Sequence, residues 1–326
     1  MGFVIHFCTY FDRNYLTRGV ALHQSLVRHS PPFTLWAICL DEDAYRTVAS
    51  LNIESLRPIK LSDLEKSDPA LLDAKENRST VEYYFTLSPS LPLYLLDQLP
   101  GVDSITYLDA DLLFYSSPQP IFDELAVGSV VIVPHRYSLA LQGLSIYGTY
   151  NVAVVAFRND EAARAVLGRW REQCLEWCYD RVEDGKYADQ RYLDEWPDLP
   201  GVRVLGHLGV DLAPWNVAQY AVDLKAEPPT VDGQPLVFYH FQGFKPVKPG
   251  LWDMALDGYE PVRPRVKSWL YGGYLRELRA AHRLVRSRVP SAARSSSIRL
   301  PRYGWRRAVK RILQGQIIVS PRSFRL

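Results

Sequence analysis

Long apolar runs are scarce in this 326-residue sequence. Stretches such as SVVIVP at 129–134 are far shorter than the roughly 20 residues that a membrane-spanning helix needs, so we expect no segment that crosses a bilayer. The opening residues, MGFVIHFCTYF, lack a basic leader followed by a removable apolar segment. Together these absences predict a cytoplasmic protein.

Cysteine is also scarce, with four in the chain. Cys8 and Cys39 close apolar, strand-like runs, where a thiol usually behaves as a small buried hydrophobe. Cys174 and Cys178 are four residues apart in a helical stretch and are expected to share one helix face. No second pair of ligands at a zinc-like spacing accompanies them. We therefore expect all four to pack in a core, in agreement with a reducing compartment.

Two phosphate-binding glycine patterns are missing. Neither the GxxxxGK loop nor the GxGxxG turn occurs in the sequence. The sequence therefore gives no support for an ATPase or for a Rossmann dehydrogenase.

The net charge of +2 hides a strong asymmetry between two parts of the chain. Residues 263–326 contain 17 Lys and Arg and one acid, Glu277, whereas residues 1–262 carry a balance of −14. We therefore divide the chain into a mildly acidic body, residues 1–262, and a basic tail, residues 263–326.

Strand and helix patterns alternate along the body. Apolar runs at 3–8, 34–39, 129–135 and 150–157 predict strands, and segments such as LTRGVALHQSLVRH and EAARAVLGRWREQCLEWCYDR have helical periodicity. The stretch RSTVEYYFTLSPSLPLYLLDQL is expected as two helical pieces that break at Pro89 and Pro92, because proline cannot donate to the helical ladder. Alternating strands and helices predict an α/β fold with a mainly parallel sheet covered on both faces.

The tail is expected to be helical around a linker. A helix following the glycines of KSWLYGGYLRELRAAHRLVRSRV, a flexible linker at 291–304 and a short basic amphipathic helix, WRRAVKRILQGQI, are predicted in turn. The apolar side of that last helix is predicted to hold Trp305, Val309, Ile312 and Leu313, and its basic side Arg306, Arg307, Lys310 and Arg311.

The stretch ITYLDADLLFYSS at 105–117 is an apolar run interrupted by Asp109 and Asp111. Ligands of parallel α/β sheets bind at the carboxyl ends of strands, and residues two apart in an extended chain point the same way. Both carboxylates can thus reach one point, where oxygen ligands suit Mg²⁺ or Mn²⁺. A pair of aspartates that caps a turn gives the same local pattern, so the pair alone leaves both interpretations open.

Further motifs favour the metal site. In chain order they are HFCTYFDRNY, YLDADLLF with PQPIFDEL after it, YNVAVVAF, YADQRYLDEW and LVFYHFQGFK. Together they resemble the GT-A glycosyltransferases, in particular the family-8-like nucleotide-diphospho-sugar transferases of bacteria, over most of residues 1–250. The resemblance implies a Rossmann-like GT-A domain.

A metal site and a donor site are implied by this resemblance. Asp109 and Asp111 would hold Mn²⁺ or Mg²⁺ with His240 as the third ligand, and the metal would act as a Lewis acid on the diphosphate of a nucleotide sugar. The implied donor contacts are Thr9, Tyr10, Tyr15, Arg78, Asp109 and Lys245. Ordinary roles stay open for the less specific of these residues: core packing for the aromatic side chains and for His240, and a solvated surface for Arg78 and Lys245.

The resemblance also places residues at the reacting sugar. Asp189 and Gln190 match positions that contact the sugar or its reacting face. Asn151 would hold the donor sugar or shape the acceptor pocket, with an asparagine that starts a strand in a turn as the alternative. Asp189 is the candidate base of an inverting reaction, although family-8-like enzymes retain configuration and we expect retention. Residues expected on the acceptor side are His135, His207 and Trp215, with core packing as the alternative for the tryptophan.

The expected function is metal-dependent transfer of a sugar from a nucleotide sugar, with UDP as the implied carrier, to a hydroxyl of a glycan or lipid-linked acceptor in bacterial surface polysaccharide synthesis. Two alternatives stay open. One is a catalytically silent, glycan-binding or scaffolding member of a polysaccharide assembly. The other is a sugar-nucleotide nucleotidyltransferase, although FCTYFDRN lacks the glycine-rich basic loop of such enzymes.

The basic tail adds an expectation about location. An amphipathic helix with arginines on one side favours binding to an anionic membrane surface, so we expect a peripheral position on the inner face of the plasma membrane. Nucleic acid is not an expected partner, because the basic residues are not interleaved with the stacking motifs of RNA-binding modules.

Overall fold

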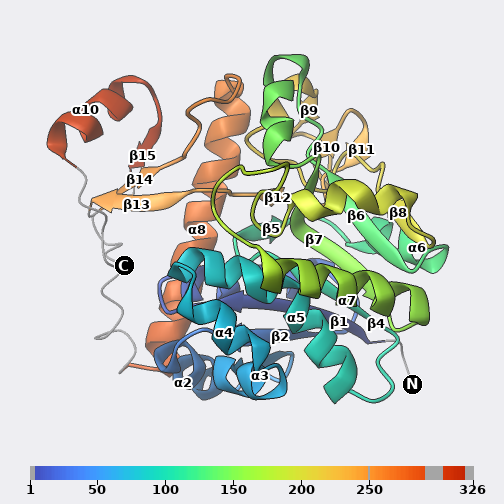
Figure 1. Cartoon of the computed structure of the whole chain (residues 1–326). Coiled ribbons are helices and arrows are strands. Elements are labelled where there is room, and N and C mark those ends of the chain that lie inside the picture. The colour runs from blue at the N-terminus through green and yellow to red at the C-terminus, as the bar shows by residue number, and fades with distance from the viewer. Residues whose placement is uncertain (1–3, 249, 291–303, 320–326) are drawn as a thin grey trace.

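The structure is a computed structural model that describes residues 4–248, 250–290 and 304–319. Its main sheet contains β1 (Ile5–Phe11), β2 (Phe33–Cys39), β3 (Leu56–Lys60), β4 (Ser104–Leu108), β6 (Val130–Pro134), β7 (Tyr150–Arg158) and β8 (Val202–Val204). The strand order is β3-β2-β1-β4-β7-β6-β8 (Figure 1). Only β7 runs antiparallel to its neighbours, β4 and β6. The sheet is therefore mixed but mainly parallel, which confirms the predicted α/β class.

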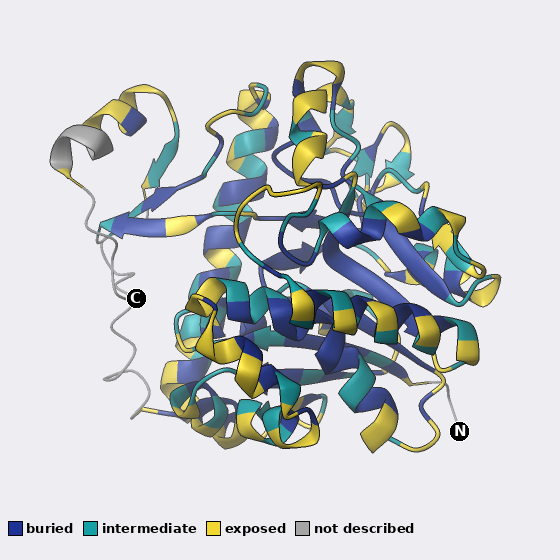
Figure 2. Cartoon of the chain, in the orientation of Figure 1, coloured by how far each residue is buried: buried dark blue, intermediate teal, exposed yellow. Residues whose placement is uncertain are grey.

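Helices cover both faces of this sheet. One apolar core joins the sheet to α1 (Leu16–His29), α2 (Glu42–Leu51), α6 (Gln119–Ala126) and α8 (Pro264–Arg288), and a second joins it to α5 (Thr80–Gln98) and α7 (Glu161–Glu176). Strand β1 contributes side chains to both cores: Phe7 and Phe11 belong to the first and Cys8 to the second. Successive side chains of a strand point to opposite faces of the sheet, so one strand can contribute to both. Figure 2 shows the buried strands between helices with exposed outer surfaces.

Shorter elements complete the described chain. The helices α3 (Leu61–Ser67) and α4 (Ala70–Glu76) pack with α5, and the 3₁₀ segments are η1 (Leu139–Tyr147), η2 (Arg191–Asp198) and η3 (Val217–Gln219). Three small antiparallel sheets are formed by β5 (Leu112–Phe114) with β12 (Phe238–His240), by β9 (Val222–Asp223), β10 (Thr230–Val231) and β11 (Gln234–Pro235), and by β13 (Lys245–Lys248), β14 (Leu251–Asp253) and β15 (Ile317–Val319).

The helix α5 corrects one prediction. It runs without a break through Pro89 and Pro92, where two helical pieces were expected. Each proline removes one backbone donor, but the surrounding turns are buried between the sheet and α7. A capping box between Ser79 and Glu82 also satisfies two backbone donors at the start of the helix, the amides of Ser79 and Glu82. Packing and capping thus outweigh the two missing hydrogen bonds.

The four cysteines are free and buried, as predicted. The expected shared helix face of Cys174 and Cys178 is wrong, because α7 ends at Glu176 and Trp177 is extended. Both thiols still reach the core that α7 makes with the sheet.

The helix α8 begins the basic segment and is part of the main core. It starts at Pro264, ahead of its two glycines, and runs as one helix to Arg288. Its buried face packs against α1 and α2 and contributes Tyr271 and Tyr274 to the core. Residues 291–303 of the predicted linker lie outside the described residues, and the division of the chain at residue 262 stays a prediction.

The amphipathic helix appears as α10 (Trp305–Leu313), with one correction to its predicted sides. Arg311 is buried, where it pairs with the carboxylates of Asp253 and Asp257, because β15 returns along β14 and turns this side of α10 toward the protein. The side chains of residues 305–308 lie outside the described part. Ile312 and Leu313 are 44% and 82% exposed, so an apolar surface of α10 is open to solvent.

We predict that α8 is required for stability of the body. The ring of Tyr274 stacks on Phe241 with a centroid distance of 3.8 Å, whereas its buried hydroxyl makes no hydrogen bond to any residue that the structure describes. Tyr274→Ala should lower the free energy of unfolding by about 3–5 kcal/mol. Tyr274→Phe should change it by less than about 1 kcal/mol. Urea denaturation of both variants measures this, and equal effects would contradict it.

Candidate active site and metal centre

Three potential metal ligands are brought together by two strand pairs. Asp109 and Asp111 lie in the turn between β4 and β5, directly after the carboxyl end of β4. The antiparallel pairing of β5 with β12 sets His240 beside Leu112. The amide of Phe241 then donates to the carbonyl oxygen of Asp111 at 3.1 Å, which fixes the end of β12 against the aspartate turn.

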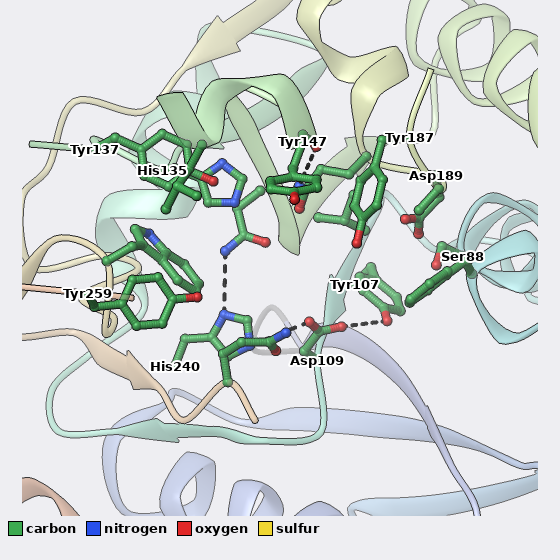
Figure 3. A pocket seen from close by; sticks show the side chains of 18 of the residues that line it. Ser88, Tyr107, Asp109, His135, Tyr137, Tyr147, Tyr187, Asp189, His240 and Tyr259 are labelled. Carbon is green, nitrogen blue, oxygen red and sulfur yellow. Dashed lines mark hydrogen bonds and ion pairs between the residues drawn. The ribbon is translucent and has the colours of Figure 1, made fainter. Parts of the chain in front are cut away.

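The functional groups of this triad converge on one point. His240 Nε2 lies 3.3 Å from Asp111 Oδ1 and 3.7 Å from Asp109 Oδ2, and one ligand atom from each residue lies within 4.8 Å of the others. Asp111 and His240 are buried, whereas the Asp109 side chain is 31% exposed. Tyr107 donates a hydrogen bond of 2.7 Å to Asp109 Oδ1 (Figure 3). The triad therefore has one open side, at Asp109.

Burial and mutual repulsion govern the electrostatics of the triad. Burial, assisted by the Asp111 charge, raises the pKa of Asp109 to about 6 although His240 acts against it. Burial also opposes the charges of Asp111 and His240, but their attraction outweighs it: the pKa of Asp111 is lowered and that of His240 is raised well above its usual value. The nearby carboxylates thus favour the positively charged form of His240.

The triad fits a divalent cation. His240 Nε2 is buried and faces the carboxylates of Asp111 and Asp109, but within the described protein it makes no hydrogen bond of good geometry, so it is available as a ligand atom. Two carboxylates and an imidazole suit Mn²⁺ or Mg²⁺ better than soft metals, because thiolates are missing from the cluster. A bound cation would replace the proton as the positive charge between the two aspartates.

A cavity of about 340 Å³ lies beside the triad and is lined by Asp109 and His240. Most of its walls are aromatic or hydroxyl-bearing (Figure 3). The aromatic residues are Tyr10, Phe85, Tyr107, Tyr137, Tyr147, Tyr187, Trp215 and Tyr259. Within the described part of the chain, no Lys or Arg lines it. Such walls offer flat apolar faces and neutral hydrogen-bonding groups, which match an uncharged sugar better than an anionic one.

The three predicted catalytic residues line this cavity together. Asn151, at the start of β7, is buried and its amide lies 3.4 Å from His240 Nδ1. Gln190 donates from Nε2 to the carbonyl oxygen of Tyr147 at 2.9 Å. Asp189 is 5% exposed, and burial raises the pKa of its carboxyl to about 7. The sequence motifs thus identified three residues that line the same cavity. Their catalytic roles stay predictions.

The predicted donor contacts separate into two groups. Tyr10 and Asp109 line the cavity. Tyr15 lies at the start of α1, 40% exposed, with the Arg18 guanidinium 4.1 Å from its ring centroid. Lys245 is exposed at the start of β13. Neither residue lines the cavity beside the triad, so their donor contacts stay predictions.

Thr9 and Arg78 are buried away from the cavity. Thr9 is fully buried within β1. The Arg78 guanidinium donates to the carbonyl oxygens of Cys174 and Leu175, at 3.1 and 2.8 Å. These carbonyls belong to the last turn of α7, where a cation is favoured by the helix dipole. Arg78 is therefore a cap of α7 in this structure, and a donor contact from it remains a prediction only.

On the predicted acceptor side, two of three residues line the cavity. His135 stacks on Tyr137 and packs edge to face against Trp215, and burial lowers the pKa of His135 to about 4. His207 lies outside the cavity, where its ring accepts a hydrogen bond from the Gly209 amide.

Several residues of the site escaped sequence reasoning. Ser88, Tyr147, Tyr187 and Tyr259 line the cavity, and Asp211 lies behind His240. They come from helices and loops in which polar or aromatic residues are common, so their types carry no signal without the fold.

The raised pKa of Asp189 predicts a pH-dependent stability. Between the ordinary pKa of 3.8 and about 7, the unfolded chain has lost a proton that the folded protein retains. Folding stability must therefore fall as pH rises through this window. Asp189→Asn removes the ionisation, so the variant should gain stability over the wild type from pH 4 to pH 8. Thermal unfolding across this range measures it, and a constant difference would contradict the raised pKa.

Comparison with known proteins places the fold. No family model matches the sequence. Two proteins of Bacillus subtilis (strain 168), both called uncharacterized, are 33% identical to the chain: YfnD over 245 residues, covering 73% of this chain and 78% of YfnD, and YfnF over 248 residues, covering 73% and 81%. Among solved structures, the galactosyltransferase LgtC in complex with donor and acceptor sugar analogs aligns with a TM-score of 0.51 and 17% identity, covering 90% of this chain and all of LgtC. This likeness shows that the chain has the GT-A fold.

Proposed function

Because the chain belongs to the same family as YfnD and YfnF and has the GT-A fold, we propose that it is a metal-dependent glycosyltransferase. Its donor would be a nucleotide sugar, with UDP as the expected carrier. Its acceptor would be a hydroxyl of a glycan or a lipid-linked glycan in bacterial surface polysaccharide synthesis.

The observation that carries this proposal is the position of the triad. Asp109, Asp111 and His240 form a cluster suited to a divalent cation, and two of them also line a cavity of sugar-compatible chemistry. When bound, Mn²⁺ or Mg²⁺ would supply Lewis-acid stabilisation to the diphosphate leaving group. A cation site beside such a cavity suits cleavage of a sugar–diphosphate bond.

The other cavity residues would bind and orient the sugars. The aromatic faces of Trp215 and Tyr259 would pack against a pyranose ring, and the amides of Asn151 and Gln190 would bond to hydroxyl groups. Asp189, with a pKa of about 7, can both hold and release a proton near neutral pH. We expect retention of configuration, as in the family-8-like enzymes that the sequence resembles.

The two alternatives lead to different assays. A silent glycan-binding protein would bind a sugar nucleotide or a glycan without turnover, and a nucleotidyltransferase would require a sugar phosphate and a nucleoside triphosphate. Within the described residues, the site combines a cation cluster with a cavity that no Lys or Arg lines. This combination favours neither the silent glycan-binding protein nor the nucleotidyltransferase.

A donor-binding assay tests the proposed function. Thermal unfolding with Mn²⁺ and UDP-, GDP-, dTDP- or CMP-sugars should show stabilisation by one nucleotide class, about 2.7 kcal/mol at a concentration about 100 times Kd. The same donor should be slowly hydrolysed or transferred to an acceptor glycan. Asp111→Asn should abolish the metal-dependent stabilisation and lower turnover by about 10²–10³-fold.

Asp68→Asn is the matched control, because Asp68 is also a buried carboxylate but pairs with Arg171 outside the cavity. It should lose stability and keep donor binding. Stabilisation without turnover of any donor would support the silent binding protein, and turnover of a sugar phosphate with a nucleoside triphosphate would support the nucleotidyltransferase.

For the tail, we propose contact with an anionic membrane on the inner face of the plasma membrane. Among the described residues, no helix is long and apolar enough to span a bilayer. The helix α10 instead exposes Val309, Ile312 and Leu313 in a segment rich in Lys and Arg. Apolar side chains beside cations suit the boundary between headgroups and acyl chains, where each cation contributes about 1 kcal/mol.

Vesicle binding tests this contact. Deleting residues from Arg299 onward should release the protein from anionic vesicles, but it also removes β15 and the Arg311 partner of Asp253, so donor hydrolysis is to be measured on the double variant that follows. The double variant Ile312→Ser, Leu313→Ser should also weaken binding. The matched pair Leu72→Ser, Val127→Ser changes exposed apolar residues far from the tail in sequence and should not. Undiminished vesicle binding by the deletion variant would refute the contact.

A further inference from the structure

We propose that Asp211 is a positioning residue of the metal centre, which fixes the proton of His240 on Nδ1 and so presents Nε2 to the cation. This inference rests on the metal site of the proposed function. Asp211 Oδ1 lies 3.6 Å from His240 Nδ1, on the side of the ring opposite Asp109 and Asp111. The imidazole is thus held between a ligand pair and a third carboxylate.

The burial of Asp211 calls for such a role. The residue is fully buried, and within the described protein its Oδ1 makes no hydrogen bond. A buried carboxylate oxygen without a donor is costly. A proton on His240 Nδ1 would supply this donor, because a small shortening of the 3.6 Å distance between Nδ1 and Asp211 Oδ1 would complete the hydrogen bond.

The backbone holds Asp211 in place. Its φ of +58° lies in the left-handed region, which non-glycine residues seldom adopt without local support. Asn216 Nδ2 donates to the Asp211 carbonyl oxygen at 2.9 Å, and the His240 amide donates to the carbonyl oxygen of Leu212 at 2.8 Å. The loop that carries Asp211 is therefore anchored directly to β12.

A competing arrangement shows why the carboxylate matters. The Asn151 amide lies 3.4 Å from His240 Nδ1 and would donate to that nitrogen if it had no proton, which would leave the proton on Nε2. Asp211 Oδ2 instead accepts from the same amide at 3.0 Å. Asn151 Nδ2 carries two hydrogens, so its bond to Asp211 leaves a second one that could reach Nδ1. The unfilled Oδ1 of Asp211, 3.6 Å from Nδ1, is what favours a proton on Nδ1 and hence the tautomer that binds a cation through Nε2.

Mn²⁺ affinity without any nucleotide tests this role. Free Mn²⁺ is counted by electron paramagnetic resonance during titration of the full chain. Asp211→Asn, which keeps the size but offers Nδ1 an amide, should weaken Mn²⁺ binding by about 10–100-fold. In a His240→Ala background the same substitution should change the affinity by no more than about twofold, because Asp211 acts through the imidazole.

Controls separate positioning from stability. Asp68→Asn, the equivalent change at a buried ion pair elsewhere, should lower thermal stability and leave the Mn²⁺ affinity unchanged. Unchanged affinity of Asp211→Asn, or an equal loss in both backgrounds, would overturn the proposal. Mn²⁺ binding without sugar transfer would refute the proposed function and leave this role intact.

A measurement on the wild type covers the case in which Asp211→Asn does not fold. Nitrogen-15 spectra of histidine-labelled protein with Zn²⁺, a diamagnetic substitute, should show His240 with a protonated Nδ1 and a metal-bound Nε2. A proton on Nε2, or metal at Nδ1, would contradict the assignment.

Discussion

Three carboxylates and one imidazole share a buried space at the end of β4, and their mutual repulsion is the constraint around which the site is arranged. Asp109, Asp111 and Asp211 surround His240 at 3.3–3.7 Å. Such a group is stable only if positive charge lies among the carboxylates. A proton on the imidazole supplies part of it, and a divalent cation would supply more. The electrostatics of this cluster are therefore consistent with a divalent cation site.

The rest of the fold holds this group against its repulsion. The β5–β12 pair and the anchored loop that carries Asp211 fix the ligands from two sides. The main sheet supplies β4 and β7 from within the two apolar cores. The cavity is lined by Asp109, the most exposed residue of the triad, so a bound cation would face this cavity. The triad is therefore held by packed strands on one side and faces an open cavity on the other.

The sequence predicts the parts of this arrangement that depend on local pattern. Apolar runs locate four strands of the main sheet, β1, β2, β6 and β7, and the pair Asp109 and Asp111 can be recognised because residues two apart share a side of an extended chain. Features that depend on distant contacts could not be predicted in this way. The uninterrupted α5 depends on packing against α7, the burial of Arg311 on the return of β15, and the place of Asp211 on a loop whose partner is β12.

A crystal structure grown with Mn²⁺ and a nucleoside diphosphate is the most direct test of the metal centre. Anomalous scattering at the manganese edge identifies the ion without reference to activity. We predict one strong peak coordinated by Asp109, Asp111 and His240 Nε2, with diphosphate oxygens on its open side. A peak at other residues, or a nucleotide bound without any metal at the triad, would contradict the proposal that this cluster of carboxylates is built around a cation.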